Sequence, residues 1–233
     1  MIFAVDVDAA GQLLRAGLMT CPTCGARLRV WTSARPRRVQ DGEGRWVELT
    51  PDRGLCRGCA ATHVVLPAWY VPRRAYTAEV IGTVLVAGAQ ANPRQTIAQR
   101  LGLPIATVAS WLTSARTAVT SLIRHAHTVA HGAVGEHRST ASWLRNDLAE
   151  ALDALGDAAR AFARGPVRPP PPHPVAPGHS GIDYLSLLDT QHHRNLRRQL
   201  HVAAPDGPLP RLAPWHVINL ITARRGLLTP TTG

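Results

Sequence analysis

Residues 94–117, RQTIAQRLGLPIATVASWLTSART, have the spacing of two short helices joined at a glycine. Gly102 lies at the turn, where a positive φ is usually required and glycine adopts it without strain. Pro104 suits the first turn of the second helix, because the N–H that it lacks would have no partner there. One face of that helix is apolar, formed by Val108, Trp111 and Leu112. The pattern is typical of a helix-turn-helix, with an ordinary helical hairpin as the alternative.

A third helix is expected before this pair. From Pro72 onward, apolar residues recur at helical spacing on a face formed by Tyr76, Val80, Val84 and Ala87. Such a helix would pack behind the other two. The sequence therefore predicts a three-helix domain over residues 72–117.

The apolar spacing continues beyond Trp111 and predicts that the second helix runs on to about Gly132. A further helix, capped at Ser139 or Thr140, is expected to end before Pro166. Its apolar face comprises Leu144, Leu148, Leu152, Leu155, Ala159 and Phe162. We expect these helices to form a long antiparallel hairpin, because the connection is short and pairing within one chain costs no association entropy. Pairing between two copies, which would give a homodimer, is the alternative.

Upstream, the chain has four cysteines in two Cys-x-x-Cys pairs: Cys21, Cys24, Cys56 and Cys59. Two thiolates separated by two residues can face one metal from a tight turn, with Gly25 and Gly58 supplying backbone freedom. Two such turns complete a tetrahedral site of four sulfur ligands, whose closed shell leaves no position for catalysis. One structural Zn²⁺ ion is therefore predicted, with His63 in a structural role. Unrelated buried cysteines or a redox pair are the alternatives.

Short strands surround these cysteines. Residues 26–39 and 45–50 have the composition of two strands, and Asp41 followed by glycine is a hairpin turn signal. A third strand is expected at residues 62–67, THVVLP, and a short strand followed by a helix in residues 2–19. Two cysteine pairs that enclose a hairpin predict a zinc ribbon.

The basic residues favour a polyanionic partner. The 233-residue chain has a formal net charge of +11, and all 26 of its basic residues are arginines. Residues 21–116 hold 13 arginines and 5 acidic residues, whereas residues 117–164 hold 5 of each. Arginine suits bidentate phosphate contacts, so double-stranded DNA is the expected partner. A high-GC coding bias is the alternative cause of the arginine choice.

The C-terminal part begins with GPVRPPPPHPVAPGHSG, which predicts an extended linker. IDYLSLLDTQHHRNLRRQL then predicts an amphipathic helix in a basic docking segment. We find neither a signal peptide nor an apolar run of membrane-spanning length, so a cytoplasmic location without membrane contact is expected. The predicted fold is mainly α with a small β zinc ribbon. Its parts are a zinc ribbon (1–71), a helix-turn-helix (72–117), a helical hairpin (118–165), a Pro-rich linker (166–181) and a partly ordered basic tail (182–233).

A resemblance to a known family covers roughly residues 15–117. Three stretches carry it: CPTCGARLRVW, CRGCAATHVVLPAWYVPRRAY and IAQRLGLPIATVASWL. Together they resemble a bacterial family of unknown function that joins a transposase-type zinc ribbon to a helix-turn-helix. Its members are often encoded beside integrases of mobile elements. The resemblance implies metal at the four cysteines, DNA contact through the helix after Pro104, and a nearby transposase or integrase as partner. Members tend to have arginine where this chain has Ala109 and Thr113, which predicts weak readout of bases.

The residue types of the second helix also predict weak readout of bases. Its groove-facing positions, Ile105, Ala106, Ala109, Ser110 and Thr113, lack the Arg, Asn or Gln that reads bases through paired hydrogen bonds. The candidate DNA contacts of the helix-turn-helix are Arg94, Gln95, Arg100, Thr107, Ser110, Thr113 and Arg116. The candidates that extend this track are Arg37, Arg38, Arg73 and Arg74. We expect phosphate contacts to dominate affinity, with a strong salt dependence; for each arginine, a solvated surface charge is the alternative.

Two further functions compete with this one. A transposase needs three carboxylates on an α/β domain to hold two divalent ions. Four of the eight acidic residues after residue 117 lie on one predicted helix, and the region lacks strand and helix alternation. We therefore predict a non-catalytic protein, either an accessory factor of transposition or a transcriptional regulator. The alternative is an adaptor that recruits a recombinase through the helical hairpin and the tail. A transposase subunit is a weaker alternative.

Overall fold

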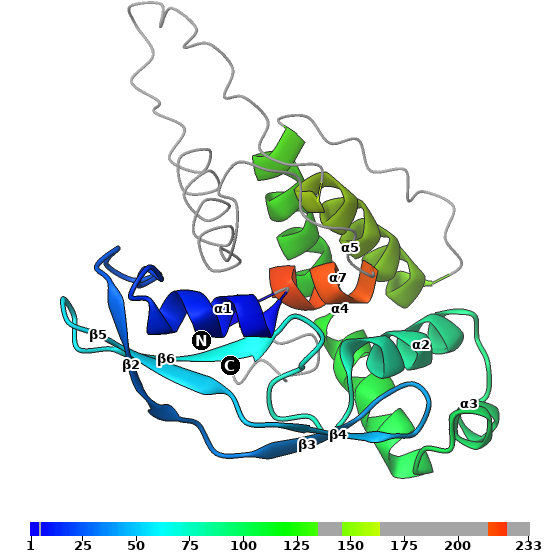
Figure 1. Ribbon diagram of the computed structural model, residues 1–233. Helices are drawn as coiled ribbons and strands as arrows, with labels where there is room; N and C mark the ends of the chain where they lie inside the picture. Colours follow the sequence, from blue (N-terminus) through cyan, green and yellow to red (C-terminus); the bar gives the residue numbers. More distant parts are fainter. Residues whose placement is uncertain (5, 135–145, 164–213, 223–233) are drawn as a thin grey trace, which may run out of the picture.

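The computed structural model of the protein describes residues 1–4, 6–134, 146–163 and 214–222 (Figure 1). Within these residues it has six helices and six strands, arranged as a small β part beside a group of helices. The fold is mixed α/β, and the four cysteines gather in its N-terminal β part. The predicted linker and most of the predicted tail lie outside the described residues.

A four-stranded sheet and one helix form the N-terminal part. The strands are β1 (Ile2–Ala4), β2 (Leu28–Ser33), β5 (Asp52–Cys56) and β6 (Thr62–Pro67), in the order β1-β6-β5-β2. β1 pairs in parallel with β6, and the other pairs are antiparallel. α1 (Val7–Arg15) lies along one face of the sheet, as predicted for a helix after a short strand. A Cβ on Gly54 would lie 2.9 Å from Leu14 Cδ1, so the sheet and the helix approach closely at this glycine.

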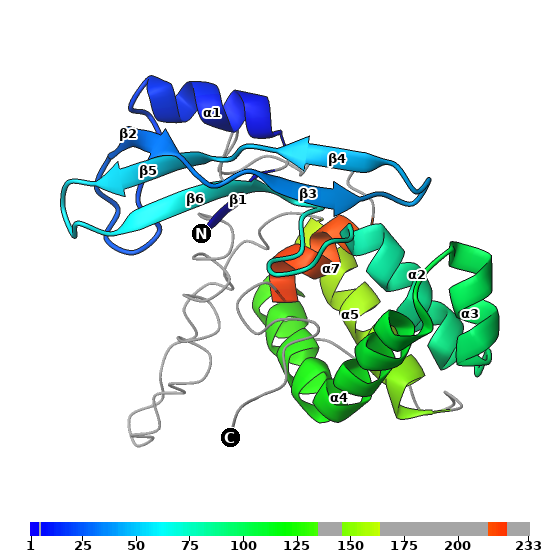
Figure 2. The same cartoon turned by 90° about the horizontal axis from the view of Figure 1, so that it is seen from below.

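A hairpin of β3 (Arg37–Gln40) and β4 (Trp46–Leu49) extends β2 and β5 beyond the sheet (Figure 2). The Ala34 N–H donates to the Pro51 carbonyl at 2.7 Å between the two strand pairs. The strands β2, β3, β4 and β5 therefore form one long antiparallel hairpin, called the ribbon below, whose base belongs to the four-stranded sheet. The predicted turn is confirmed, but the prediction of a single strand over residues 26–39 is wrong. Pro36 interrupts it, because proline cannot donate to a strand partner.

Three helices follow: α2 (Ala78–Ala89), α3 (Arg94–Leu101) and α4 (Ile105–Val134). α3 and α4 lie where the sequence predicts them, whereas α2 begins at Ala78, so that Tyr76 of its predicted face precedes the helix. Gly102 ends α3 in the left-handed conformation, with φ 63°. A Cβ on Gly88 would lie 2.2 Å from Leu112 Cδ2, so α2 and α4 approach closely at this glycine. Tyr76 packs edge-on against Trp111 of α4, with the ring centroids 5.2 Å apart.

α5 (Asp147–Ala163) packs along α4 within the same chain. The prediction of an antiparallel hairpin is wrong. The first residues of α5 lie beside Arg116 and Val119 in the middle of α4, and the two helices run in the same general direction in Figure 1. The Asn146 Nδ2 donates to the Ala89 carbonyl at 2.8 Å, which places the start of α5 at the end of α2.

The start of α5 also differs from the prediction. Its N-terminal cap is Asn146, whose Oδ1 accepts a hydrogen bond from the Ala149 N–H at 3.0 Å. The predicted capping residues, Ser139 and Thr140, lie outside the described residues. The predicted apolar face of this helix is confirmed from Leu148 to Phe162, apart from the half-buried Leu152.

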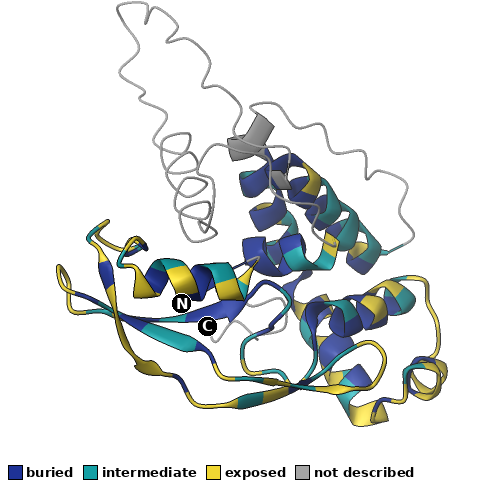
Figure 3. Ribbon diagram, viewed as in Figure 1, coloured by how far each residue is buried: buried dark blue, intermediate teal, exposed yellow. Residues whose placement is uncertain are grey.

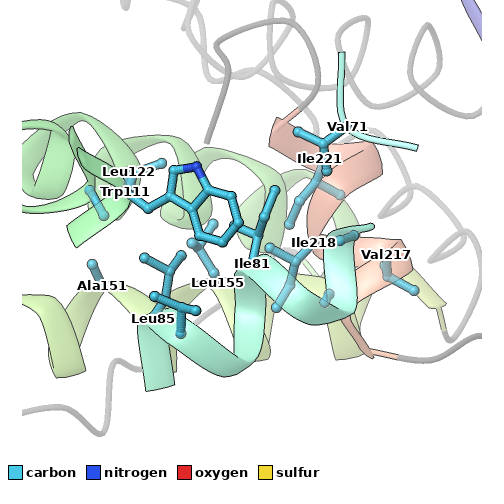
Figure 4. Packing of buried hydrophobic residues seen from close by; sticks show 14 of the residues in the cluster. Val71, Ile81, Leu85, Trp111, Leu122, Ala151, Leu155, Val217, Ile218 and Ile221 are labelled. Carbon is cyan, nitrogen blue, oxygen red and sulfur yellow. The ribbon is translucent and has the colours of Figure 1, made fainter. Parts of the chain in front are cut away.

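α7 (Pro214–Thr222) belongs to the core, although we predict this segment as part of a basic tail. It contacts α2, α4 and α5, and its buried apolar residues are Val217, Ile218, Leu220 and Ile221. Figure 4 shows this packing, with Ile218 and Ile221 of α7 close to Ile81 of α2. A Cβ on Gly82 would lie 2.0 Å from the Trp215 ring, so Gly82 makes room for α7.

The main core extends from the β part into the helices. Phe3, Val39 and Leu66 belong to the same buried cluster as the residues of α2, α4, α5 and α7. The hairpin is also joined to the entry of α2, since the Thr77 N–H donates to the Gln40 carbonyl at 3.1 Å. The sheet and helices are therefore held in a defined arrangement. In Figure 3 the exposed residues concentrate on the ribbon and on the surface of α3.

Candidate metal centre and helix pair

The two Cys-x-x-Cys segments fold into equivalent turns. The Cys21 N–H donates to the Ala26 carbonyl at 2.7 Å, and the Cys56 N–H donates to the Ala61 carbonyl at 2.9 Å. The fourth residue after the first cysteine is left-handed in both turns: φ is 76° at Gly25 and 57° at Ala60.

Gly25 adopts this conformation without strain, as predicted, whereas Ala60 adopts it at a cost. The reason predicted for Gly58 is wrong, because its φ is not left-handed. A Cβ there would lie 2.8 Å from Ala26 Cβ and 3.3 Å from Cys24 Sγ. Gly58 is required because the two turns approach each other closely.

The four sulfur atoms form a compact group. Cys21 Sγ lies 3.7 Å from Cys59 Sγ, Cys24 Sγ lies 3.4 Å from Cys56 Sγ, and all four lie within 4.8 Å of one another. Four sulfurs at ~2.3 Å from a tetrahedral ion would be separated by about 3.8 Å. The cysteines are free, without disulfides. This donor set fits one metal ion, as predicted from the spacing.

Backbone N–H groups prepare the site for thiolates. The Thr23 N–H donates to Cys21 Sγ at 3.4 Å, and the Gly58 N–H donates to Cys56 Sγ at 3.3 Å. Each donor is the second residue after the cysteine, so this feature also repeats between the turns. Hydrogen bonds of this kind orient the ligands and offset part of their negative charge.

The pKa values of two facing thiols diverge. The backbone N–H of Cys59 lowers the pKa of Cys56 to about 6. The Ala26 N–H favours the Cys24 thiolate, but the neighbouring sulfur of Cys56 raises the pKa of Cys24 to about 12. These contacts thus favour the thiolate at Cys56 over the thiolate at Cys24. Because thiols lose their protons when they bind a metal cation, metal affinity depends on pH.

His63 of β6 lies against the cluster. Its Nε2 is 3.3 Å from Cys21 Sγ, and the side chain is buried. A neutral ring that carries its proton on Nε2 donates to the Cys21 thiolate, and Nδ1 is buried without a hydrogen-bond partner among the described residues. The four sulfurs complete a tetrahedral set without it, which is consistent with the predicted structural role.

The second candidate region is the helix pair α3–α4. Ile97 and Ala98 of α3 are buried, as are Val108, Trp111 and Leu112 of α4. The predicted contact residues lie on the outer side of these helices. Exposed are Arg94, Gln95, Arg100, Ser110, Thr113 and Arg116, and Thr107 is half-buried. The structure thus brings these seven side chains onto two adjoining helices.

The other four predicted arginines lie on different elements. Arg37 and Arg38 belong to β3, and Arg73 and Arg74 to the turn before α2. Arg37 lies over the Tyr70 ring, with its Cζ 5.3 Å from the ring centroid. Arg38 pairs with Glu48 at 3.6 Å. Arg37 and Arg38 therefore have partners within the protein, so they are not purely solvated charges.

Two exposed aromatic residues are not among the predicted site residues. Trp31 of β2 and Trp46 of β4 are each about half exposed, and an arginine lies over each ring. The segment RLRVW shows alternating arginine and apolar residues, which a search for exposed strand faces would have detected.

Residues 21–104 match a family described as a domain of unknown function (DUF6431). The matched segment contains all four cysteines, the hairpin, α2 and α3, and it ends immediately before α4. The predicted likeness to a family of unknown function is confirmed over these residues. Searches of curated proteins and of solved structures find no match. No helix among the described residues has the length and apolar composition needed to cross a membrane.

Proposed function

We propose that this chain is a non-catalytic protein that binds double-stranded DNA through α3 and α4. The observation that carries the proposal is the geometry at Gly102. Its left-handed conformation turns the chain from α3 into α4 within a few residues. The inner faces of both helices are buried, and the first turns of α4 keep an exposed outer face. This is the arrangement that a helix-turn-helix uses to place its second helix in the major groove.

The charge of the helix pair supports the same proposal. Neither α3 nor α4 contains an aspartate or glutamate. Exposed arginines lie at the start of α3, near its end and on the fourth turn of α4: Arg94, Arg100 and Arg116. Arginines suit contact with phosphates, and the one carboxylate that lines the same cavity as Arg116 is that of Asp147, at the start of α5.

We further propose that binding depends on phosphates more than on bases. Ile105, Ala106 and Ser110 occupy exposed positions on the first turns of α4. None of them can form the paired hydrogen bonds that arginine, asparagine or glutamine makes with a base edge. Affinity should therefore fall steeply with salt and vary little with sequence.

Zinc is the proposed ion at the cysteine cluster. Four thiolates would close its coordination shell, so the ion would supply folding free energy and take no part in chemistry. The ion would then hold the two Cys-x-x-Cys turns together at one end of the sheet. The ribbon extends from this sheet toward α2. In this proposal the metal orders the β part, and the helix pair contacts DNA.

The experiment is fluorescence anisotropy with the full chain, one equivalent of zinc, and a labelled duplex, repeated over a range of NaCl concentrations. We compare Arg116→Gln with Arg124→Gln, an exposed arginine eight residues further along α4. Loss of one phosphate contact should weaken binding and reduce the slope of log K against log salt by about 0.9. A flat salt slope for the unaltered protein, or equal effects of both substitutions, would contradict the proposal.

We also propose the biological role that the sequence resemblance implies. The protein would be either an accessory factor for a transposase or integrase, or a regulator. Selection of bound fragments from random DNA separates the two. Enrichment of one motif would favour a regulator, and the absence of enrichment would favour an accessory role.

A further inference from the structure

Two tryptophans stand out on the surface of the ribbon. Trp31 is 53 % exposed and Trp46 is 50 % exposed. Tryptophan is highly buried on average in folded proteins, so two half-exposed rings on one ribbon are candidates for contact with a partner. Figure 3 shows that much of this ribbon is exposed.

An arginine accompanies each ring. The Arg29 Cζ lies 5.4 Å from the centroid of Trp31, and the Arg38 Cζ lies 5.1 Å from the centroid of Trp46. At these distances the cation is attracted to the face of the ring. The contact also restricts the ring, so that less conformational entropy is lost when a ligand stacks on it.

The strand register explains why Trp31 projects. Val30 pairs with Gly54 and Thr32 pairs with Arg53, so Trp31 is the extra residue of a β-bulge on the edge strand β2. Bulges redirect side chains and often occur next to functional sites. Trp46 lies on the outward face of the hairpin, diagonally across from Arg38, whereas Val39 points into the core.

The charge of the ribbon decides what kind of partner it suits. Arg38 pairs with Glu48, and Arg45 pairs with both Asp41 and Glu43. Three further exposed arginines on or beside β2 form no ion pair with a described residue: Arg27, Arg29 and Arg35. The surplus charge is positive and lies beside Trp31. The partner should therefore combine several negative charges with flat rings.

We propose that this ribbon binds single-stranded nucleic acid, with Trp31 and Trp46 stacking on bases and Arg27, Arg29 and Arg35 contacting phosphates. Base faces are accessible in a single strand and covered by neighbouring base pairs in a duplex. The ribbon is thus a second nucleic-acid surface, separate in its residues from α3 and α4. It does not depend on the duplex-binding proposal.

A protein partner is the competing explanation, because tryptophan and arginine also dominate protein interfaces. The arginines favour nucleic acid. A protein interface buries few charges in its centre, whereas the ribbon carries unpaired arginines directly beside the exposed ring.

The test uses the full zinc-loaded chain and a fluorescein-labelled 12-mer of deoxythymidine, measured by anisotropy. Trp31→Ala and Trp46→Ala should each weaken binding by roughly 5- to 150-fold, the range seen when one stacked base is lost. Trp31→Phe and Trp46→Phe should retain most of the affinity. Val86→Ala, at an exposed apolar residue of α2, is the matched control and should leave binding unchanged. Zinc content and the circular dichroism spectrum verify that each variant folds.

An abasic oligonucleotide of the same length separates stacking from charge. The unaltered protein should bind it more weakly than either single alanine variant binds the deoxythymidine 12-mer, because an abasic strand offers no base to either ring. Arg94→Gln combined with Arg100→Gln should leave binding to the 12-mer intact even if duplex binding is lost. Equal affinity of the unaltered protein for both oligonucleotides, or unchanged binding by both alanine variants, would overturn the proposal.

Discussion

Asn219 joins α7 to the chain segment between β6 and α2. Its side-chain Nδ2 donates to the Ala68 carbonyl at 2.8 Å and to the Tyr70 carbonyl at 2.9 Å. All three residues are buried. Asn219→Ala would leave two buried carbonyls without this donor, and each such loss costs about 1–3 kcal/mol. We expect the free energy of unfolding to fall by about 2–4 kcal/mol, since solvent will reach part of the site.

The assay is equilibrium unfolding in urea of the zinc-loaded protein, followed by far-UV circular dichroism. Hydrogen exchange of the peptide that covers α7 reports whether this helix opens locally before the rest unfolds. Asn219→Asp is the matched variant. It keeps the shape, but an ionised aspartate only accepts hydrogen bonds and would face two acceptors. It should destabilise at least as much as alanine at pH 7. A loss below about 0.5 kcal/mol for both variants, with unchanged exchange, would refute this role of Asn219.

Backbone conformation, metal and pH give three more predictions. Gly102→Ala should lower the free energy of unfolding by about 1 kcal/mol, and Ala60→Gly should raise it by a similar amount, because both positions are left-handed. Urea unfolding measures both changes. Gly42→Ala is the control and should change the free energy of unfolding little. Cys59→Ser should reduce bound zinc well below one equivalent in a metal analysis, and retention of a full equivalent would contradict the four-sulfur site. Partial desolvation opposes ionisation of Asp41, but the Arg45 N–H and guanidinium outweigh it and lower the pKa of this carboxyl. The resulting stabilisation is present above the ordinary pKa and is lost as pH falls through the lowered one. Asp41→Asn should therefore destabilise the hairpin at pH 7 and have little effect once the pH is below the lowered pKa. An Asp41 titration by NMR with an ordinary midpoint would contradict it.

Local spacing in the sequence determined much of this protein. The Cys-x-x-Cys pairs predict the metal centre because two residues between thiols suffice to form the turn, whatever the rest of the chain does. Gly102 and Pro104 predict the boundary between α3 and α4 for a similar reason, since each limits its own backbone dihedrals. The long helix α4 follows from apolar residues at helical spacing. These features depend on neighbours within a few residues.

Only the tertiary structure decided how distant segments meet. β1 joins the sheet in parallel with β6, although more than 60 residues separate Ile2 from its partner Val65. α5 begins at the end of α2, where Asn146 binds the Ala89 carbonyl, and it packs along α4 in the same general direction; helical periodicity encodes neither contact. α7 enters the core through the space at Gly82 and the carbonyls that receive Asn219. An apolar face in the sequence shows that a segment must be buried, but its partner depends on shape and hydrogen bonding across the whole fold. The two arginine–tryptophan contacts show the same difference. The contact of Arg29 with Trp31 follows from local spacing, whereas the contact of Arg38 with Trp46 requires the hairpin register.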